Sequence, residues 1–376
     1  MASPVYLLRI ADWKNLDLVA ERLRDLLARA PLLDGARSGH PAAVKLTFGE
    51  KGNTAYPPVR LVREVVSALG KRGARPFLTE TNTLYHGQRK NALDHLELAR
   101  QHGFTHESVG APIILGDGVL GRDVHEFPLG GPHVKTAHLA PVLRDCEFLV
   151  SLAHVTGHLL VGFGGAMKNI GMGLAGRAGK LEMHRIVRPV VEPGKCTACL
   201  RCVAACAANA ITPPRSKARA KAGGAAGPNL RATRSRAVTI DASLCTGCAD
   251  CLAVCPSGAI SINWSDDSQQ VQERIAEYAL AVSKMMANRL AYINLLNHIS
   301  DHCDCLGATP RLISPDIGIA ASLDPVALDQ ASIDLVRAAS GGDAFGQAWP
   351  KADCEAQLRH AETIGLGNRA YEVVEF

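Results

Sequence analysis

The chain has 376 residues, of which 47% are hydrophobic and 20% charged, with a formal net charge of +5. This composition predicts an ordinary globular protein of about two or three domains. Seven Lys or Arg and no acidic residue lie between Arg215 and Arg236, so the excess positive charge belongs to one loop and gives no evidence of nucleic-acid binding.

We expect this basic loop to be a flexible, solvated insertion, with docking of an acidic partner as the alternative. The N-terminus reaches Asp12 and Lys14 before a signal peptide could be completed. The most apolar region, residues 148–166, is interrupted by histidines and glycines, so we expect no membrane span and a cytoplasmic protein. Twelve cysteines in a reducing compartment indicate metal ligation in preference to disulfides.

The first half of the chain alternates short apolar runs with amphipathic stretches, which predicts an α/β fold with a mostly parallel sheet. The predicted strands are residues 5–10, 44–48, 77–81, 113–115 and 148–152. The predicted helices are residues 16–30, 59–72, 90–102, 269–297 and 324–339. The last of these helices would have Asp324 as its N-cap and Pro325 at its first position.

The composition changes abruptly near residue 192, where a cysteine-rich segment begins. We therefore predict a discontinuous α/β body formed by residues 1–191 and 265–376. A ferredoxin-like α+β insert would occupy residues 192–264, with residues 215–236 as its flexible loop.

Two runs of four cysteines give the strongest signal in the sequence. Each run has the spacing Cys-x2-Cys-x2-Cys-x3-Cys, and Pro256 follows the second. The spacing predicts two [4Fe-4S] clusters, because three close cysteines hold one cubane and the fourth ligates the other. The predicted ligands of one cluster are Cys196, Cys199, Cys202 and Cys255. The predicted ligands of the other are Cys245, Cys248, Cys251 and Cys206.

These runs resemble those of bacterial two-cluster ferredoxins, with two departures. Ala207 stands where the first run usually has proline, and the basic loop lengthens the connection between the runs. A pair of zinc sites is the alternative, since paired Cys-x2-Cys groups also bind zinc tetrahedrally. Two clusters close together favour electron relay over a purely structural role.

A glycine-rich segment precedes the insert. Gly162, Gly164 and Gly165 would form a turn between a strand and a helix, where backbone N–H groups favour an anionic cofactor or substrate. A tight packing turn is the alternative.

Several polar side chains near this turn could carry acid–base chemistry. His154 and His158 are four residues apart and could share one helix face, and imidazole titrates near neutrality. Glu80, with Asn82 and Tyr85, follows a predicted strand end, where open α/β sheets place their sites; a helix cap and turn is the alternative. The other residues that we group with the two histidines are Lys168, Asn169, Arg177, Lys180 and His184.

A second group of soft ligands lies at His298, His302, Cys303 and Cys305. It could bind a metal, act as a reactive thiol pair, or be buried as small side chains. Cys146 and Cys354 stand alone in the sequence, and we expect them to be buried.

Residues 157–184, the cysteine-rich insert and residues 314–336 resemble the domain-of-unknown-function 362 family of iron–sulfur centre proteins. This resemblance implies an iron–sulfur protein without a generally assigned reaction. The order and spacing of His158, Lys168 and His184 are also similar to those in the nickel-pincer lactate racemases. That similarity implies an acid/base role for His158, an anchoring role for Lys168 and nickel ligation by His184. An electron-transfer insert does not suit a reaction without net redox change, so we retain the shared pocket and not the nickel cofactor.

The sequence as a whole predicts an iron–sulfur oxidoreductase that passes electrons through two [4Fe-4S] clusters to a small molecule in the α/β body. A redox partner protein is expected as electron donor or acceptor. Two alternatives stay open: a non-catalytic electron carrier or assembly factor, and a nickel-dependent isomerase with structural clusters.

Overall fold

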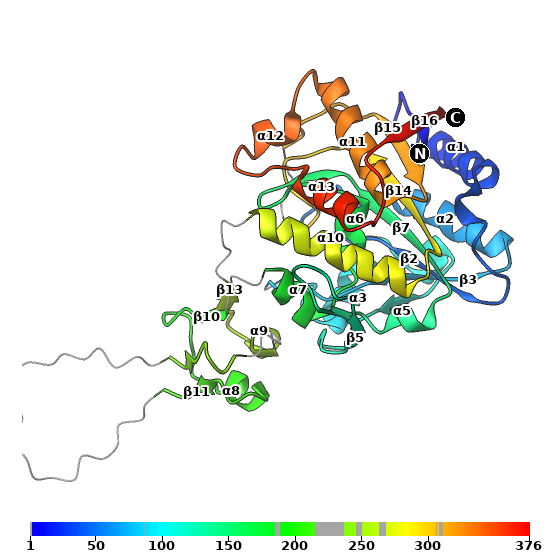
Figure 1. Ribbon diagram of the computed structural model, residues 1–376. Coiled ribbons are helices and arrows are strands. Elements are labelled where there is room, and N and C mark those ends of the chain that lie inside the picture. Colours follow the sequence, from blue (N-terminus) through cyan, green and yellow to red (C-terminus); the bar gives the residue numbers. More distant parts are fainter. Residues whose placement is uncertain are drawn as a thin grey trace, which may run out of the picture.

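The computed structural model describes residues 2–85, 87–184, 189–214, 237–245, 250–262, 268–305, 307 and 311–376 (Figure 1). The predicted basic loop at 215–236 and the predicted ligand Cys248 lie outside the described residues. The described chain forms a large α/β body and a smaller cysteine-rich lobe (Figure 1).

An eight-stranded sheet forms the centre of the body. In spatial order its strands are β16 (Tyr371–Glu375), β1 (Ser3–Arg9), β15 (Gly318–Ser322), β14 (Leu290–Leu296), β7 (Phe148–His154), β2 (Pro41–Lys45), β3 (Arg75–Glu80) and β4 (Ile113–Leu115). Strand β15 is antiparallel to both of its neighbours, and all other pairings are parallel. The sequence prediction of a mostly parallel α/β sheet is confirmed.

Helices cover both faces of this sheet (Figure 1). One face packs against α1 (Leu16–Arg29), the 3-10 turn η1 (Pro31–Leu33), α2 (Val59–Lys71), α3 (Ala92–Gln101) and α4 (His106–Val109). The other packs against α5 (Val142–Asp145), α6 (Ala166–Gly171), α7 (Arg177–Met183), α10 (Ser268–Met285), α11 (Pro325–Ser340), α12 (Ala344–Ala348) and α13 (Ala356–Thr363). Two hairpins, β5 (His125–Pro128) with β6 (Thr136–Leu139) and β8 (Thr156–His158) with β9 (Gly162–Gly164), complete the body.

Strand β14 shows how one apolar run serves both faces. Tyr292 and Leu296 pack into the core that contains α6 and α10, while Ala291, Ile293 and Leu295 pack into the core that contains α1 and α2. Successive side chains of a strand point to opposite faces, so a strand covered on both sides must be apolar at nearly every position. All seven residues of β14 are buried.

The predicted helix over residues 269–297 is wrong in its second half. Helix α10 ends at Met285, Ala287 and Asn288 have positive φ angles of 48° and 58°, and the chain then enters β14. A continuous apolar run fits a buried strand as well as a buried helix, so periodicity could not separate them. By contrast, α11 begins at Pro325 as predicted, with the Asp324 carboxylate accepting the N–H groups of Val326 and Ala327.

The cysteine-rich lobe consists of short elements. Its strand pairs are β10 (Pro189–Val191) with β13 (Ile260–Ile262) and β11 (Ile211–Thr212) with β12 (Thr239–Ile240), and its helices are α8 (Arg201–Ala205) and α9 (Asp250–Val254). Its buried residues form a small cluster that includes Cys202, Cys251 and Cys255. Leu84 and Leu181 of the body belong to the same cluster, so the lobe packs on the body through these two leucines.

Candidate functional site

A cavity of about 480 Å³ lies at the carboxyl ends of the central parallel strands. The last residues of three of these strands line it: Lys45 of β2, Glu80 of β3 and His154 of β7. The carboxyl ends of parallel strands meet at one edge of a sheet, which is where open α/β folds bind ligands. The cavity also receives residues from the β8–β9 hairpin, from α6 and α7, and from the loop after β14.

Lys45 and Glu80 form a buried ion pair at the base of the cavity. The Lys45 ammonium lies 2.9 Å from the Glu80 carboxylate, and their side chains are 1% and 7% exposed. The ammonium also donates to Oδ1 of Asn169, 2.9 Å away, and the Asn169 amide donates to Ser151. Burial lowers the pKa of Lys45, and the Glu80 carboxylate opposes that shift. Asn169 is thus oriented by the ion pair and by β7.

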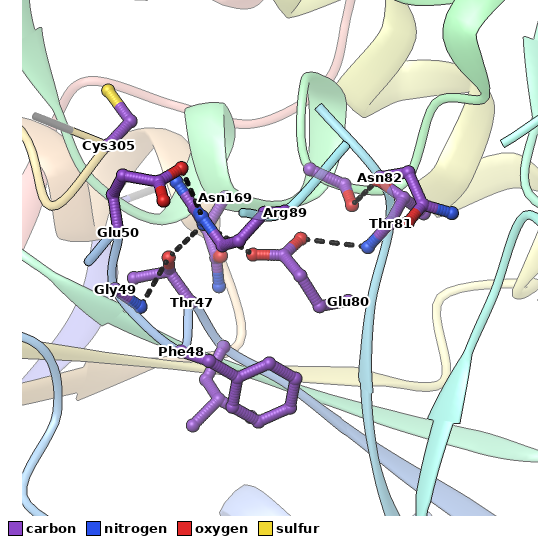
Figure 2. Close-up of polar contacts among 12 residues, drawn as sticks. Thr47, Phe48, Gly49, Glu50, Glu80, Thr81, Asn82, Arg89, Asn169 and Cys305 are labelled. Atoms are coloured by element: carbon purple, nitrogen blue, oxygen red, sulfur yellow. Dashed lines mark hydrogen bonds and ion pairs between the residues drawn. The ribbon is translucent and has the colours of Figure 1, made fainter. Parts of the chain in front are cut away.

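Arg89 lies between two carboxylates beside this pair (Figure 2). Its guanidinium is 3.6 Å from Glu50 and 3.7 Å from Glu80, and it donates to Thr47 Oγ1 at 2.8 Å. It also donates to the Tyr85 hydroxyl at 2.5 Å. Burial raises the pKa of Tyr85 to about 12, so this hydroxyl stays protonated at neutral pH.

Lys168 differs from the other cations of the cavity. Within the described residues, no hydrogen bond or ion pair connects its ammonium to another side chain, whereas Lys180 donates to Thr81 and to the carbonyls of Asn82 and Ala175. Burial lowers the pKa of Lys168 to about 8. At neutral pH most of this side chain is therefore a cation that lines the cavity and is available to a ligand.

His158 and His184 line the same cavity as neutral imidazoles. Burial, followed by the charge of Lys168, lowers the pKa of His184 to about 4 and that of His158 well below its usual value. The Nδ1 atom of His158 accepts the N–H groups of Leu160 and Val161, at 3.2 and 3.3 Å. A neutral ring with this acceptor carries its proton on Nε2.

His154 has a different role from the one the sequence indicated. It does not share a helix face with His158, because it ends β7 and His158 lies in β8. Its Nδ1 lies 2.9 Å from Asp304, and its Nε2 lies 2.6 Å from the Asn297 carbonyl. Burial lowers its pKa, but the Asp304 carboxylate, the Asn297 carbonyl and the charge of Asp316 together outweigh burial, and the net shift is upward. His154 thereby links the loop after β14 to β7, the strand that His154 ends.

That loop contributes His302, Cys303, Asp304 and Cys305 to the cavity. The two cysteines are joined by a disulfide, and their sulfur atoms and one ring nitrogen of His158 all lie within 4.8 Å of one another. His298, in contrast, is exposed and does not line the cavity. Cys146 and Cys354 are buried thiols, as predicted.

The glycine-rich turn has the predicted order of strand, turn and helix. Its helix, α6, begins after Gly165, but the N–H groups of Ala166 and Met167 donate to the Asp329 carboxylate, at 2.8 and 2.9 Å. A Cβ on Gly165 would lie 2.4 Å from that carboxylate. The anion expected at this helix start is therefore supplied by the chain itself, and the turn serves packing.

Three more predicted residues lie outside the cavity lining. Gly162 packs against Cys354, and the side-chain amide of Asn82 donates to Asp117 at 2.8 Å. Arg177 is buried and donates to the carbonyls of Leu120 and Lys90. Gly164 and Gly165 do line the cavity.

Sequence reasoning missed Lys45, Arg89 and Asp304. Lys45 is a charged residue at the end of an apolar run, as Glu80 is, and that signal could have identified it. Arg89 lies in an irregular segment and Asp304 between two cysteines, so neither has a local signal; the fold alone brings them to the cavity.

In the lobe, Cys196, Cys199, Cys202 and Cys255 line one small cavity. These are three cysteines of the first run with the last of the second. Ala198 and Leu200, between them, have positive φ angles of 53° and 60°, which lets the backbone curve around the cavity. Cys206 and Cys245 are half-buried and Cys251 is buried.

In the described part of the chain, no helix combines the length and the apolar character that a membrane crossing requires. No curated protein matches this chain. Two solved structures share 12% and 10% identity with it: the lactate racemase apoprotein from Thermoanaerobacterium thermosaccharolyticum, at a TM-score of 0.40, and a structural-genomics protein from Thermotoga maritima, at 0.39. The alignments cover 81% and 92% of this chain but only 52% and 59% of those chains.

A family model, by contrast, matches residues 42–334, which include the cavity residues from Lys45 to Cys305 and the whole cysteine-rich lobe. The match covers well over half of the chain, and the chain therefore belongs to the family described as Domain of unknown function (DUF362).

Proposed function

We propose that this protein is an iron–sulfur oxidoreductase that exchanges electrons between two [4Fe-4S] clusters in the cysteine-rich lobe and a small anionic substrate in the body cavity. The observation that carries the proposal is the position of Leu84. This residue lines the cavity and also belongs to the buried cluster that contains Cys202, Cys251 and Cys255. One side chain therefore belongs both to the wall of the cavity and to the packed core of the lobe.

The donor set of the lobe fits iron–sulfur clusters. Four cysteines line one cavity in the combination that bacterial-type spacing requires, three from one run and the last from the other. By the same rule Cys206 would complete the second set with Cys245, Cys251 and Cys248. When bound, the clusters would supply or accept single electrons.

The charges of the cavity favour a small anion as substrate. Among the described residues, four basic side chains line the cavity, Lys45, Arg89, Lys168 and Lys180, against two carboxylates, Glu80 and Asp304. Glu80 is paired with Lys45, which leaves Lys168 as the cation best placed to receive a substrate carboxylate or phosphate. Leucine, valine and isoleucine side chains on the wall suit a short apolar portion of the same molecule.

Protonated Lys168 can supply a proton to the bound molecule, and neutral His158 can donate a hydrogen bond to it. Reduction of an organic substrate requires protons as well as electrons, and groups inside the cavity deliver them without bulk water. The Nε2–H of His158 is the hydrogen-bond donor that its Nδ1 contacts leave available, and Lys168, with a pKa near 8, can lose a proton close to neutrality.

Two other functions make different predictions. A pure electron carrier would need no cavity with buried lysine and histidine side chains. A nickel-dependent isomerase is favoured by one observation, the convergence of His158, Lys168 and His184 on one cavity. It would racemise a substrate without an electron donor and would contain nickel.

The test begins with strictly anaerobic purification, followed by iron, sulfide, zinc and nickel counts and by electron paramagnetic resonance of the reduced protein. We expect about eight irons and two interacting paramagnets per chain. The reduced protein is then mixed with panels of small acids, and reoxidation is followed by absorbance. Zinc without sulfide, or reoxidation by proteins alone, would contradict the proposal.

A substitution at Leu84 tests whether this residue links the lobe to the cavity. Leu84→Ser should keep the iron count and slow reoxidation by substrate, because it loosens the packing between lobe and cavity. Leu93→Ser, at a leucine that is 72% exposed, is the matched control and should behave like the unmodified chain. Equal rates of reoxidation in the two variants would show that Leu84 is not part of the electron-transfer path.

A further inference from the structure

Cys303 and Cys305 lie in the cavity as a pair with a defined orientation. Asp304, between them, is held by His154, and Ser300 Oγ donates to the carbonyl of His302 at 2.8 Å. With the middle residue fixed, the two cysteine side chains meet on one side, where they form a disulfide with their Cα atoms 5.3 Å apart. The loop is thus built to present both sulfur atoms together.

The surroundings of this pair suit thiol chemistry. One ring nitrogen of His158 lies within 4.8 Å of both sulfur atoms, and the ring carries its proton on Nε2. An imidazole this close to a cysteine pair suits thiol–disulfide chemistry, as it does in other cysteine–histidine pairs. Lys168, in the same cavity, adds a positive charge that also favours a thiolate.

We propose that Cys303 and Cys305 form a redox-active dithiol–disulfide pair that reduces small anionic disulfides in the cavity. This inference rests on the proposed function for its electron supply and names the substrate class of the same site. Sulfur is the natural reaction partner because a dithiol transfers its two electrons by thiol–disulfide exchange.

The proposed cycle consists of two half-reactions, one that reduces the substrate and one that reduces the cysteine pair. First, one cysteine thiolate attacks a sulfur of the substrate disulfide, that S–S bond breaks, and one substrate thiol leaves. The second cysteine then attacks the mixed disulfide, which releases the other substrate thiol and restores the Cys303–Cys305 bond. In the second half this bond accepts two electrons and two protons and becomes two thiols. The electrons come from a low-potential one-electron donor acting through the lobe.

The first experiment is an anaerobic titration of the whole protein in dithiothreitol redox buffers, with mass-tagged alkylation of each cysteine. We expect Cys303 and Cys305 to convert together, with a tenfold change in their disulfide-to-dithiol ratio for every 30 mV or so, as a two-electron couple requires. Cys146 and Cys354 are buried single thiols and serve as internal controls.

The second experiment traps the intermediate with a probe of matched chemistry. Cys305→Ser should accumulate a mixed disulfide between Cys303 and dithiodipropionate, an anionic disulfide, and should react at least tenfold more slowly with cystamine, a cationic one. Cys146→Ala, which removes a thiol outside the cavity, should turn over like the unmodified chain.

The outcomes separate this inference from the proposed function. If the clusters are absent but the pair titrates and traps dithiodipropionate, the inference stands and the electron supply is wrong. If the clusters are present but both thiols stay reduced at every potential, or hold an equimolar chelatable metal, the pair is not a redox centre and the inference is overturned. Equal rates with both probes would overturn the anionic substrate class.

Discussion

The body and the lobe of this protein are stabilised in different ways. The body buries two large apolar clusters, one on each face of its sheet. The lobe has one small cluster, in which several of the buried residues are cysteines, and its strands are two or three residues long. A core of this size cannot offset the entropy of ordering the chain, so we expect the lobe, unlike the body, to depend on the proposed clusters for its stability.

Removal of one ligand should produce the largest effect and test this difference directly. We expect Cys255→Ser to lose cluster binding and, with it, the fold of the lobe, because metal binding to such a domain contributes roughly 10 kcal/mol. Amide hydrogen exchange should become fast over residues 189–214, 237–245 and 250–262 and stay slow in β7 and β14. Retained protection throughout the lobe would show that its packing suffices without metal.

A substitution at Lys168 tests the binding site of the body in the same way. Lys168→Ala should leave the iron count unchanged and weaken binding of an anionic substrate about 10- to 100-fold, the effect of one charge-assisted hydrogen bond. Lys351→Ala, at an exposed lysine, is the control. Isothermal titration with the substrate measures both variants. An altered cluster spectrum in Lys168→Ala would assign this residue to folding.

Lys168 should also make the affinity for an anionic substrate depend on pH. Its pKa is lowered to about 8, so the protonated form that binds anions is present below that pH and is lost above it. Affinity for an anionic substrate should therefore fall as the pH rises from 7 to 9, and the variant should lack this decline. A decline that persists in Lys168→Ala would point to another group, such as Lys180.

The smallest expected effect concerns packing within the body. A Cβ on Gly171 of α6 would lie 2.4 Å from the Ile275 carbonyl of α10, whereas one on Gly70 of α2 would meet nothing within 4 Å. Gly171→Ala should lower the free energy of unfolding of the body by about 1–3 kcal/mol, and Gly70→Ala should raise it by up to about 1 kcal/mol. Urea unfolding measures both. Equal free energies of unfolding for the two variants would mean that α6 and α10 can move apart without loss of stability.

Prediction from the sequence succeeded best where the evidence is local. The start of α11 followed from Asp324 and Pro325, because a helix cap is made by neighbouring residues. Prediction failed at β14, where a buried strand and a buried helix have the same apolar composition. It also allowed His154 and His158 to share one helix face, because a spacing of four residues says nothing about the strand pairings that separate them.

The sequence by itself determined the α/β class of the body and the spacing of the two cysteine runs, because strand patterns and ligand spacing are properties of short segments. Only the tertiary structure brought Lys45, Glu80, Lys168 and Cys305 to one cavity, since parallel strands from distant parts of the chain end at a common edge. It also decided that Asp329 fills the start of α6 while Lys168 faces the cavity. A charged side chain can bind a ligand when burial removes its water and its own protein gives it no partner. Which side chains are buried in this way depends on the whole fold.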